Sequence, residues 1–154
     1  MKGNPQILER LDTLLADELT AINQYMVHTE MCDNWGYARL DEKVQQRAVQ
    51  EMKHAERLIA RILFLEGSPT VSKLNAIHIG EDVPKQFDHD LAAELHTNRL
   101  YNDAIRLAGE LGDAATREML EHILKEEDEH VDWLEAQRDQ IQQMGLPMYL
   151  STQT

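Results

Sequence analysis

Residue types that bind metals recur in this chain at a constant offset. Three residues and their copies 76 positions later form the set: Glu18, Glu51, His54, Glu94, Glu127 and His130. In each copy, a lone Glu precedes a Glu-x-x-His motif by 33 residues. A Glu and a His three residues apart project from the same face of a helix. Two lone glutamates and two such motifs, on four helices, are the ligand set of a carboxylate-bridged dinuclear metal site.

The donor atoms indicate which metals would bind. Four carboxylates and two imidazoles suit iron or manganese and also accept zinc. Four negative charges would match two divalent cations with both imidazoles neutral. Glu51 and Glu127 are the expected bridging ligands, because each shares its helix face with a histidine, and Glu18 and Glu94 are then terminal.

The alternative is a set of ordinary solvated carboxylates on helix surfaces. One Glu-x-x-His motif fits that alternative well, but two copies with matched partner glutamates favour a metal site. Glu18 also lies in an apolar stripe with Leu11, Leu15 and Ile22. A buried, unpaired carboxylate is costly, and a bound metal removes that cost.

Two aromatic residues are expected near the metals. Tyr25 lies two helical turns after Glu18, and Trp133 lies three residues after His130. Tyr25 is a candidate catalytic residue, because a phenol beside a dinuclear iron site can hydrogen-bond a ligand or supply an electron. The alternative for both, and for the repeat partner Tyr101, is core packing. The remaining histidines are interpreted as surface or structural residues: His28, His78, His89, His96 and His122.

The segments that must position these residues are all helical in pattern. Helices are predicted at about 5–33, 38–66 and 84–111, and from the break at 112–113 to about 144, with one or two short turns, or a short helix, at the C-terminus. Gly and Pro lie at the junctions. A long stretch without helical periodicity separates the second and third helices. The chain therefore predicts a four-helix bundle of two antiparallel hairpins joined by a long crossover.

The ligand spacing supports the same pairing. Facing residues of an antiparallel hairpin lie equally far from its turn. The midpoint between Glu18 and Glu51 falls in the predicted turn at 33–36, and the midpoint between Glu94 and Glu127 falls beside the predicted break at 112–113.

Length and composition narrow the kinds of protein that this chain can be. A chain of 154 residues is expected to form one domain, 1–154. It has no apolar stretch long enough to span a membrane, and its start lacks the apolar region of a signal peptide. The single Cys32 agrees with a reducing cytoplasm. A net charge of -13 argues against binding nucleic acid over a broad surface.

The sequence resembles the bacterioferritins, the haem-containing bacterial ferritins, nearly from end to end. The similar segments include Asn23-Gln24-Tyr25, Asn34-Trp35-Gly36, Glu51-Met52-Lys53-His54-Ala55, the run 61–67, Glu127-x-x-His130 and Trp133-Leu134-Glu135. The resemblance implies a ferritin-like fold and a cytoplasmic iron-storage shell of 24 subunits. It also implies that Fe(II) is oxidised by O2 or H2O2 at a di-iron ferroxidase centre within each subunit, with the six residues above as ligands.

The same resemblance implies haem b shared between two subunits, with Met52 from each chain as an axial ligand. Met52 follows Glu51 directly, so it is rotated about 100° from the bundle interior. It lies on a second apolar face with Ala48, Ala55 and Ile59, which suggests a partner subunit. The alternative is an interface methionine that binds no haem.

The chain departs from the family at two places. Many members have a Tyr, a His and an acidic residue where this chain has Gln45, Gln46 and Gln50. Neutral amides are weak iron ligands, so an iron site on the inner surface is in doubt. Three residues match positions that line a pore in the family, and a fourth replaces a common polar residue there: Asn34, Glu66, Asp132 and Ala136.

Three functions are compatible with these features. The leading one is a ferroxidase that stores ferric mineral in a homo-oligomer or in a shell mixed with a sister subunit, with a ferredoxin-type reductant for release. The second is a di-iron oxygenase, although the chain has little sequence beyond the bundle. The third is a non-catalytic or haem-carrying partner subunit of a mixed shell, against which the complete ligand set argues.

Overall fold

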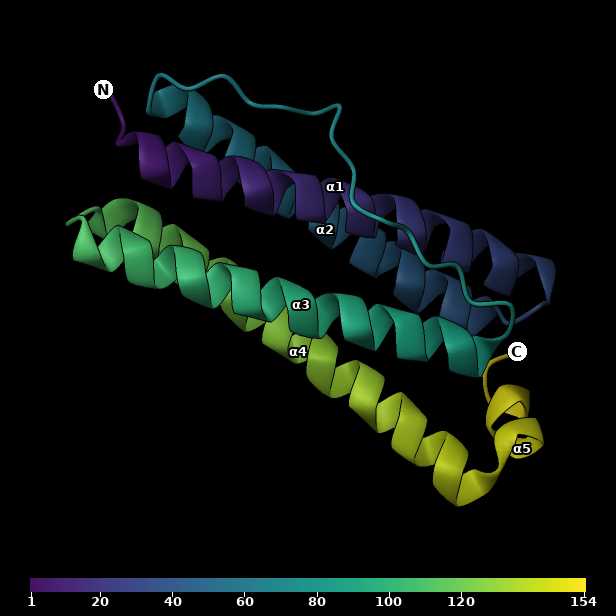
Figure 1. Ribbon diagram of the computed structural model, residues 1–154. Coiled ribbons are helices and arrows are strands. Elements are labelled where there is room, and N and C mark those ends of the chain that lie inside the picture. Colours follow the sequence, from purple (N-terminus) through teal and green to yellow (C-terminus); the bar gives the residue numbers. More distant parts are fainter.

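Four long helices lie side by side as two hairpins, and a short helix follows at the C-terminus (Figure 1). The computed structural model describes residues 1–154. The helices are α1 (Pro5–Asn34), α2 (Ala38–Phe64), α3 (Val83–Glu110), α4 (Ala114–Met144) and α5 (Leu146–Ser151). This arrangement confirms the predicted all-α bundle with its short C-terminal helix.

The helix boundaries agree with the sequence prediction to within two residues, and α2 shows the largest difference. It ends at Phe64 rather than at residue 66, because Glu66 adopts a left-handed conformation with φ 60°. The N–H of Gly67 then donates to the carbonyl of Ile62 at 2.9 Å, which closes the end of the helix. The residue that reverses the chain is therefore the one before the expected glycine.

Side-chain caps begin three of the long helices. Asn4 accepts from the N–H of Gln6, and Pro5 occupies the first turn of α1. Asp82 caps α3 and Asp113 caps α4, each through its side-chain oxygen. Helix α2 has no such side-chain cap at Tyr37.

Apolar side chains fill the two ends of the bundle and leave a polar layer between them. The end near the N-terminus is filled by buried residues of all four long helices: Ile7, Leu11, Leu14, Leu15, Ala55, Leu58, Ile62, Leu65, Tyr101, Ala104, Leu120 and Ile123. The other end holds a smaller cluster: Cys32, Leu40, Val83, Phe87, Leu91, Leu134 and Tyr149. The six candidate ligands lie along the helices between these clusters.

The crossover between α2 and α3 runs along α1 (Figure 1). Its backbone N–H groups donate to α1 side chains, including Thr20, Gln24 and His28. His28 is fully buried and pairs with Asp90 of α3 at 3.0 Å, which agrees with a structural role. At Gly80, a Cβ would lie 2.2 Å from the backbone of Gln86, so only glycine allows this approach.

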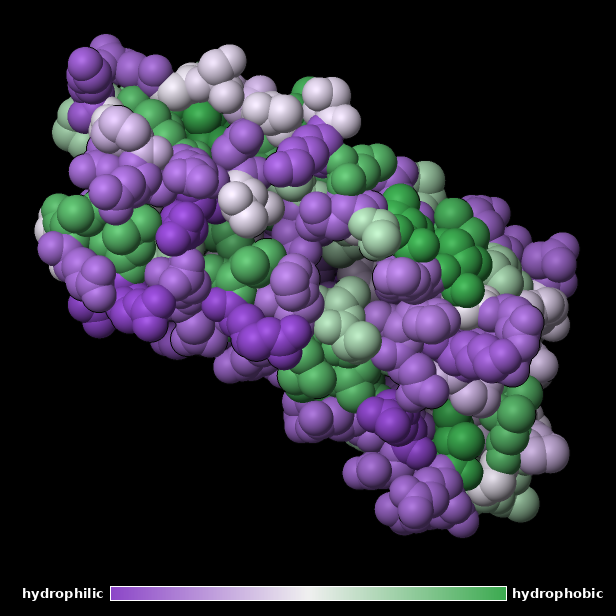
Figure 2. Space-filling view, viewed as in Figure 1, coloured by the Kyte–Doolittle hydropathy of each residue, from purple (hydrophilic) through white to green (hydrophobic).

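Hydrophilic residues cover most of the face seen in Figure 2, and hydrophobic residues gather in a few clusters on it. None of the helices has both the length and the apolar character needed to cross a bilayer. Some large apolar side chains remain exposed on α1 and α2, among them Met26 at 50%, Val49 at 42% and Met52 at 46%.

Candidate metal centre

All six candidate ligands are buried at the middle of the bundle, and each of the four long helices contributes at least one. None of the six is more than 7% exposed. Helix α1 carries Glu18, α2 carries Glu51 and His54, and α3 carries Glu94. The remaining pair, Glu127 and His130, lies on α4.

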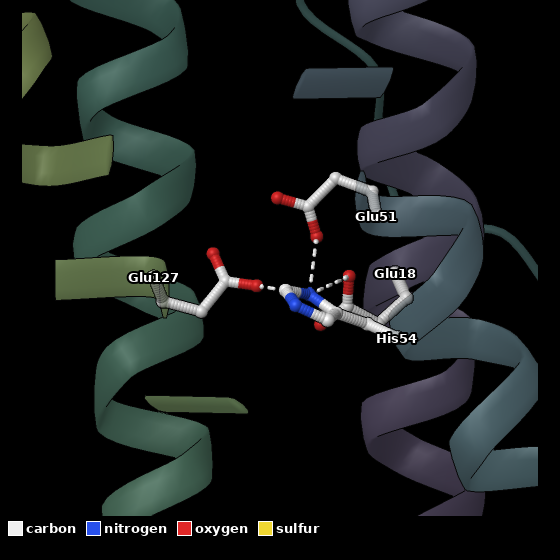
Figure 3. A group of neighbouring side chains, drawn as sticks. All are labelled: Glu18, Glu51, His54 and Glu127. Carbon is white, nitrogen blue, oxygen red and sulfur yellow. Dashed lines mark hydrogen bonds and ion pairs between the residues drawn. The ribbon is translucent and has the colours of Figure 1, made fainter. Parts of the chain in front are cut away.

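Four of the six form a tight group around the His54 ring (Figure 3). One ligand atom from each of Glu18, Glu51, His54 and Glu127 lies within 4.8 Å of the others. The Nδ1 atom of His54 is 2.9 Å from Glu127 Oε1 and 3.3 Å from Glu51 Oε2. It is 3.7 Å from Glu18 Oε2. Three helices thus converge on a position that one cation could occupy.

Glu94 and His130 lie beside this group rather than within it. His130 Nε2 is 3.8 Å from Glu94 Oε1. The His130 ring stacks on Trp133, with centroids 5.8 Å apart, and meets the ring of Tyr25 edge-on. The predicted proximity of Trp133 to His130 is therefore present as a stacking contact.

The two repeated tyrosines bind across the hairpins. The hydroxyl of Tyr25 on α1 donates to Glu94 on α3. The hydroxyl of Tyr101 on α3 donates to Glu18 on α1, at 2.6 Å. Each lone glutamate is therefore held by the tyrosine of the other hairpin, and this part of the repeat is symmetric in space.

Arg47 is a buried member of this centre that the sequence interpretation missed. Its Nη2 atom lies 2.7 Å from Glu127 and 2.9 Å from Glu51. Its Nη1 atom donates to Gln50 Oε1 at 2.5 Å. The available signal was the position of Arg47, four residues before Glu51 and so on the same helix face.

Glu126 is the second residue that was missed. Its Oε2 atom lies 2.5 Å from His54 Nε2, the ring atom that faces away from the carboxylate group. A carboxylate in this position fixes the orientation of a histidine and raises its basicity as a ligand. The signal was again its place in the sequence, directly before Glu127.

Burial and repulsion between charges raise the pKa of three of the four candidate glutamates. Burial and the charge of Glu51 raise the pKa of Glu18 well above its usual value. Burial and the charges of Glu94 and Glu51 do the same for the pKa of Glu127. The pKa of Glu94 rises to about 7 through burial and the charge of Glu51. A metal that binds these groups must therefore displace protons.

The two histidines shift in opposite directions. Burial lowers the pKa of His54, but hydrogen bonds and charges from Glu18 and Glu51 outweigh it and raise the pKa to about 10. Burial lowers the pKa of His130 well below its usual value, and the charge of Arg47 lowers it further.

Five buried atoms of the candidate ligands make no hydrogen bond, although each lies within ion-pair distance of a neighbour. They are Glu18 Oε2, Glu51 Oε1, Glu94 Oε2, Glu127 Oε1 and His130 Nε2. Buried polar atoms without partners are rare in folded proteins. Oxygen and imidazole donors concentrated in this way fit a dinuclear iron or manganese site.

A helical bundle with such a centre defines the ferritin-like class, and residues 8–144 match the family model described as a ferritin-like domain. The chain is also similar to curated bacterioferritins. It is 39% identical to that of Mycolicibacterium paratuberculosis over 149 residues, which is 97% of this chain and 94% of the relative.

Two further bacterioferritins give the same picture. The protein of Brucella melitensis is 36% identical over 149 residues, 97% of this chain and 92% of the relative. That of Rhodobacter capsulatus is 39% identical over 145 residues, 94% of this chain and 90% of the relative. The chain belongs to the bacterioferritin family.

Proposed function

We propose that this member of an iron-storage family oxidises Fe(II) at a dinuclear centre formed by the six buried ligands. The observation that carries the proposal is their burial at mid-bundle, with four of them in one tight group and five of their donor atoms without a hydrogen bond. Glu51 and Glu127 would be shared between the two metal positions. Glu18 and His54 would complete one position, and Glu94 and His130 would complete the other.

The substrates are Fe(II) and O2 or H2O2. Two Fe(II) ions give up one electron each. The electron pair reduces O2 with two protons to H2O2, or reduces H2O2 with two protons to water. The protein sets the distance between the two metal positions and the polarity of their surroundings. Tyr25 and Tyr101 hold the lone glutamates, Glu126 orients His54, and the buried layer excludes bulk water.

Oxidation kinetics test this proposal. Replacing both His54 and His130 by Ala should slow Fe(II) oxidation by at least about a hundredfold, because each metal position loses its imidazole. Replacing two exposed histidines that contact none of the candidate ligands, His78 and His96, by Ala is the matched control and should leave the rate unchanged. An unchanged rate in the His54 and His130 double variant would refute the assignment.

The oxidised iron is stored as ferric mineral in a hollow shell, for which 24 subunits is the expected number in this family. The acidic chain, with a net charge of -13, would attract cations to such a shell. We place the protein in the cytoplasm, with a ferredoxin-type reductant for iron release. The mass of the purified particle tests the shell, and a protein that stays monomeric or dimeric at physiological salt contradicts it.

Met52 is the proposed axial ligand for haem b between two subunits. It follows the buried Glu51 directly but is itself 46% exposed, and Val49 on the same helix is also exposed. A thioether suits haem iron, and two chains across a two-fold axis supply both axial positions. Met52→Leu should abolish haem absorption while the shell and Fe(II) oxidation survive. Unchanged haem content would leave Met52 with an interface role only.

A further inference from the structure

Arg47 places a permanent positive charge among the candidate ligands. Its side chain is only 6% exposed, and Nη2 lies 2.7 Å from Glu127 Oε2, 2.9 Å from Glu51 Oε1 and 3.7 Å from Glu94 Oε2. These three residues are the carboxylates assigned above to the metal position that His130 completes. The inference below therefore rests on the proposed dinuclear function.

The two bridging carboxylates are divided between His54 and Arg47, one oxygen to each. Glu51 turns Oε2 toward His54 and Oε1 toward Arg47. Glu127 turns Oε1 toward His54 and Oε2 toward Arg47. A bridging carboxylate offers its two oxygens to two cations in the same way. The guanidinium thus stands at the second of the two positions that the bridges define.

We propose that Arg47 is an internal counter-cation that competes with the second metal ion, so that the two positions load unequally. The first ion binds at Glu18, Glu51, His54 and Glu127, where Arg47 blocks only part of the ligand set. The second ion binds only when the guanidinium withdraws. Arginine does not lose its proton under ordinary conditions, so it must move to release these carboxylates.

The structure provides a place for the withdrawn side chain. Arg47 borders a cleft of about 140 Å³ that is also lined by Lys43, Gln46, Gln50, Glu129, His130 and Trp133. Its Nη1 atom already bonds to Gln50 and reaches the carbonyl of Glu126 at 3.3 Å. Rotation into this cleft can keep the bond to Gln50 while Nη2 leaves the bridging oxygens.

The repeat shows that this charge belongs to one hairpin only. The position 76 residues after Arg47 is Ile123, which is fully buried in the apolar core. No second arginine therefore stands against the position that His54 completes. The competing positive charge is therefore present at one of the two metal positions and absent from the other.

Stepwise titration of the assembled protein with Co(II), followed by its visible absorption, tests the proposal. In the wild type, one Co(II) per chain should bind at least about tenfold more tightly than the second, which corresponds to about 1.4 kcal/mol. In Arg47→Gln the second ion should bind at least about tenfold more tightly than in the wild type, because its competitor is gone. Lys43→Gln is the matched control, since Lys43 lines the same cleft on the same helix but lies over the Trp133 ring. It should leave the second affinity within about threefold of the wild type.

Three outcomes would overturn the role of Arg47: equal affinities for the two ions in the wild type, an unchanged second affinity in Arg47→Gln, or an equal gain in Lys43→Gln. If Arg47→Gln does not assemble, Arg47→Leu takes its place. The wild-type titration still shows whether the two positions load unequally. Failure of the dinuclear site itself would look different. Wild-type protein would then bind no Co(II) in the bundle, or binding would survive in Glu127→Ala.

Discussion

His54 and His130 occupy equivalent positions of one repeat, yet their surroundings differ. His54 is enclosed by three carboxylates on one side and held by Glu126 on the other, at 2.5 Å. His130 stacks on Trp133, and its Nε2 atom has no hydrogen-bond partner. The repeated pattern therefore fixes where the candidate ligands lie along the helices. Residues outside the pattern determine which neighbours hold each histidine ring.

The difference comes from residues at matched places in the repeat. Glu126, which holds His54, has Gln50 as its counterpart 76 residues earlier. Gln50 donates to Glu126 and accepts from Arg47, and it makes no bond to His130. Glu126 of the second hairpin thus orients His54 of the first. No carboxylate of the first hairpin orients His130 in the same way.

Exchanging Glu126 and Gln50 for each other's residue type should have the largest effect on the difference in metal affinity between the two positions. Glu126→Gln removes the charged partner of His54. It should weaken binding of the first metal ion about 10- to 100-fold, the usual range for loss of such a partner. Gln50→Glu supplies a carboxylate beside Arg47 and on the side of His130. It should strengthen binding of the second ion, because the guanidinium gains an acceptor outside the centre. Calorimetric metal titration measures both.

A matched control is available on the same helix as Glu126. Glu118→Gln removes an equal charge from an exposed position of α4 and should change neither affinity. If Glu126→Gln weakens both ions equally, Glu126 acts through the overall field and the contrast between the histidines does not hold.

Replacing either tyrosine should have a smaller effect, and the two replacements should destabilise the protein equally. Tyr25→Phe and Tyr101→Phe each leave a buried carboxylate of the other hairpin without its donor. We expect each to lower the free energy of unfolding by about 1–3 kcal/mol, with similar values for the two. Thermal unfolding of the metal-free variants checks this. A loss of Fe(II) oxidation in Tyr25→Phe alone, with equal stability losses, would instead assign Tyr25 a role in electron transfer.

The fold was largely predictable because its signals are local and repeated. Apolar spacing, glycine and proline breaks, and the equal distances of Glu18 and Glu51 from their turn all indicate two hairpins. Glu66 escaped prediction, because a left-handed conformation at a non-glycine residue is decided by its context rather than by its type.

The buried position of the six candidate ligands was predictable, but the charged side chains that share their layer were not. The spacing of Glu-x-x-His places ligands on a face without showing which other side chains share that face. Arg47 has a long, flexible side chain, so its position in the sequence allows it to point inward or into solvent. Only the packing of α2 against α4 brings its guanidinium to Glu127.

Anomalous diffraction at the iron edge, from crystals soaked in Fe(II) without oxygen, tests the central claim most directly. The account predicts two iron peaks at the middle of each bundle, bridged by Glu51 and Glu127, with donor atoms about 2.0–2.6 Å from the metals. The peak beside His54 should be the stronger at low iron, and Arg47 should have left the bridging oxygens wherever the peak beside His130 is present. Crystals that hold iron only outside the bundle, or bound by residues other than these six, would contradict it.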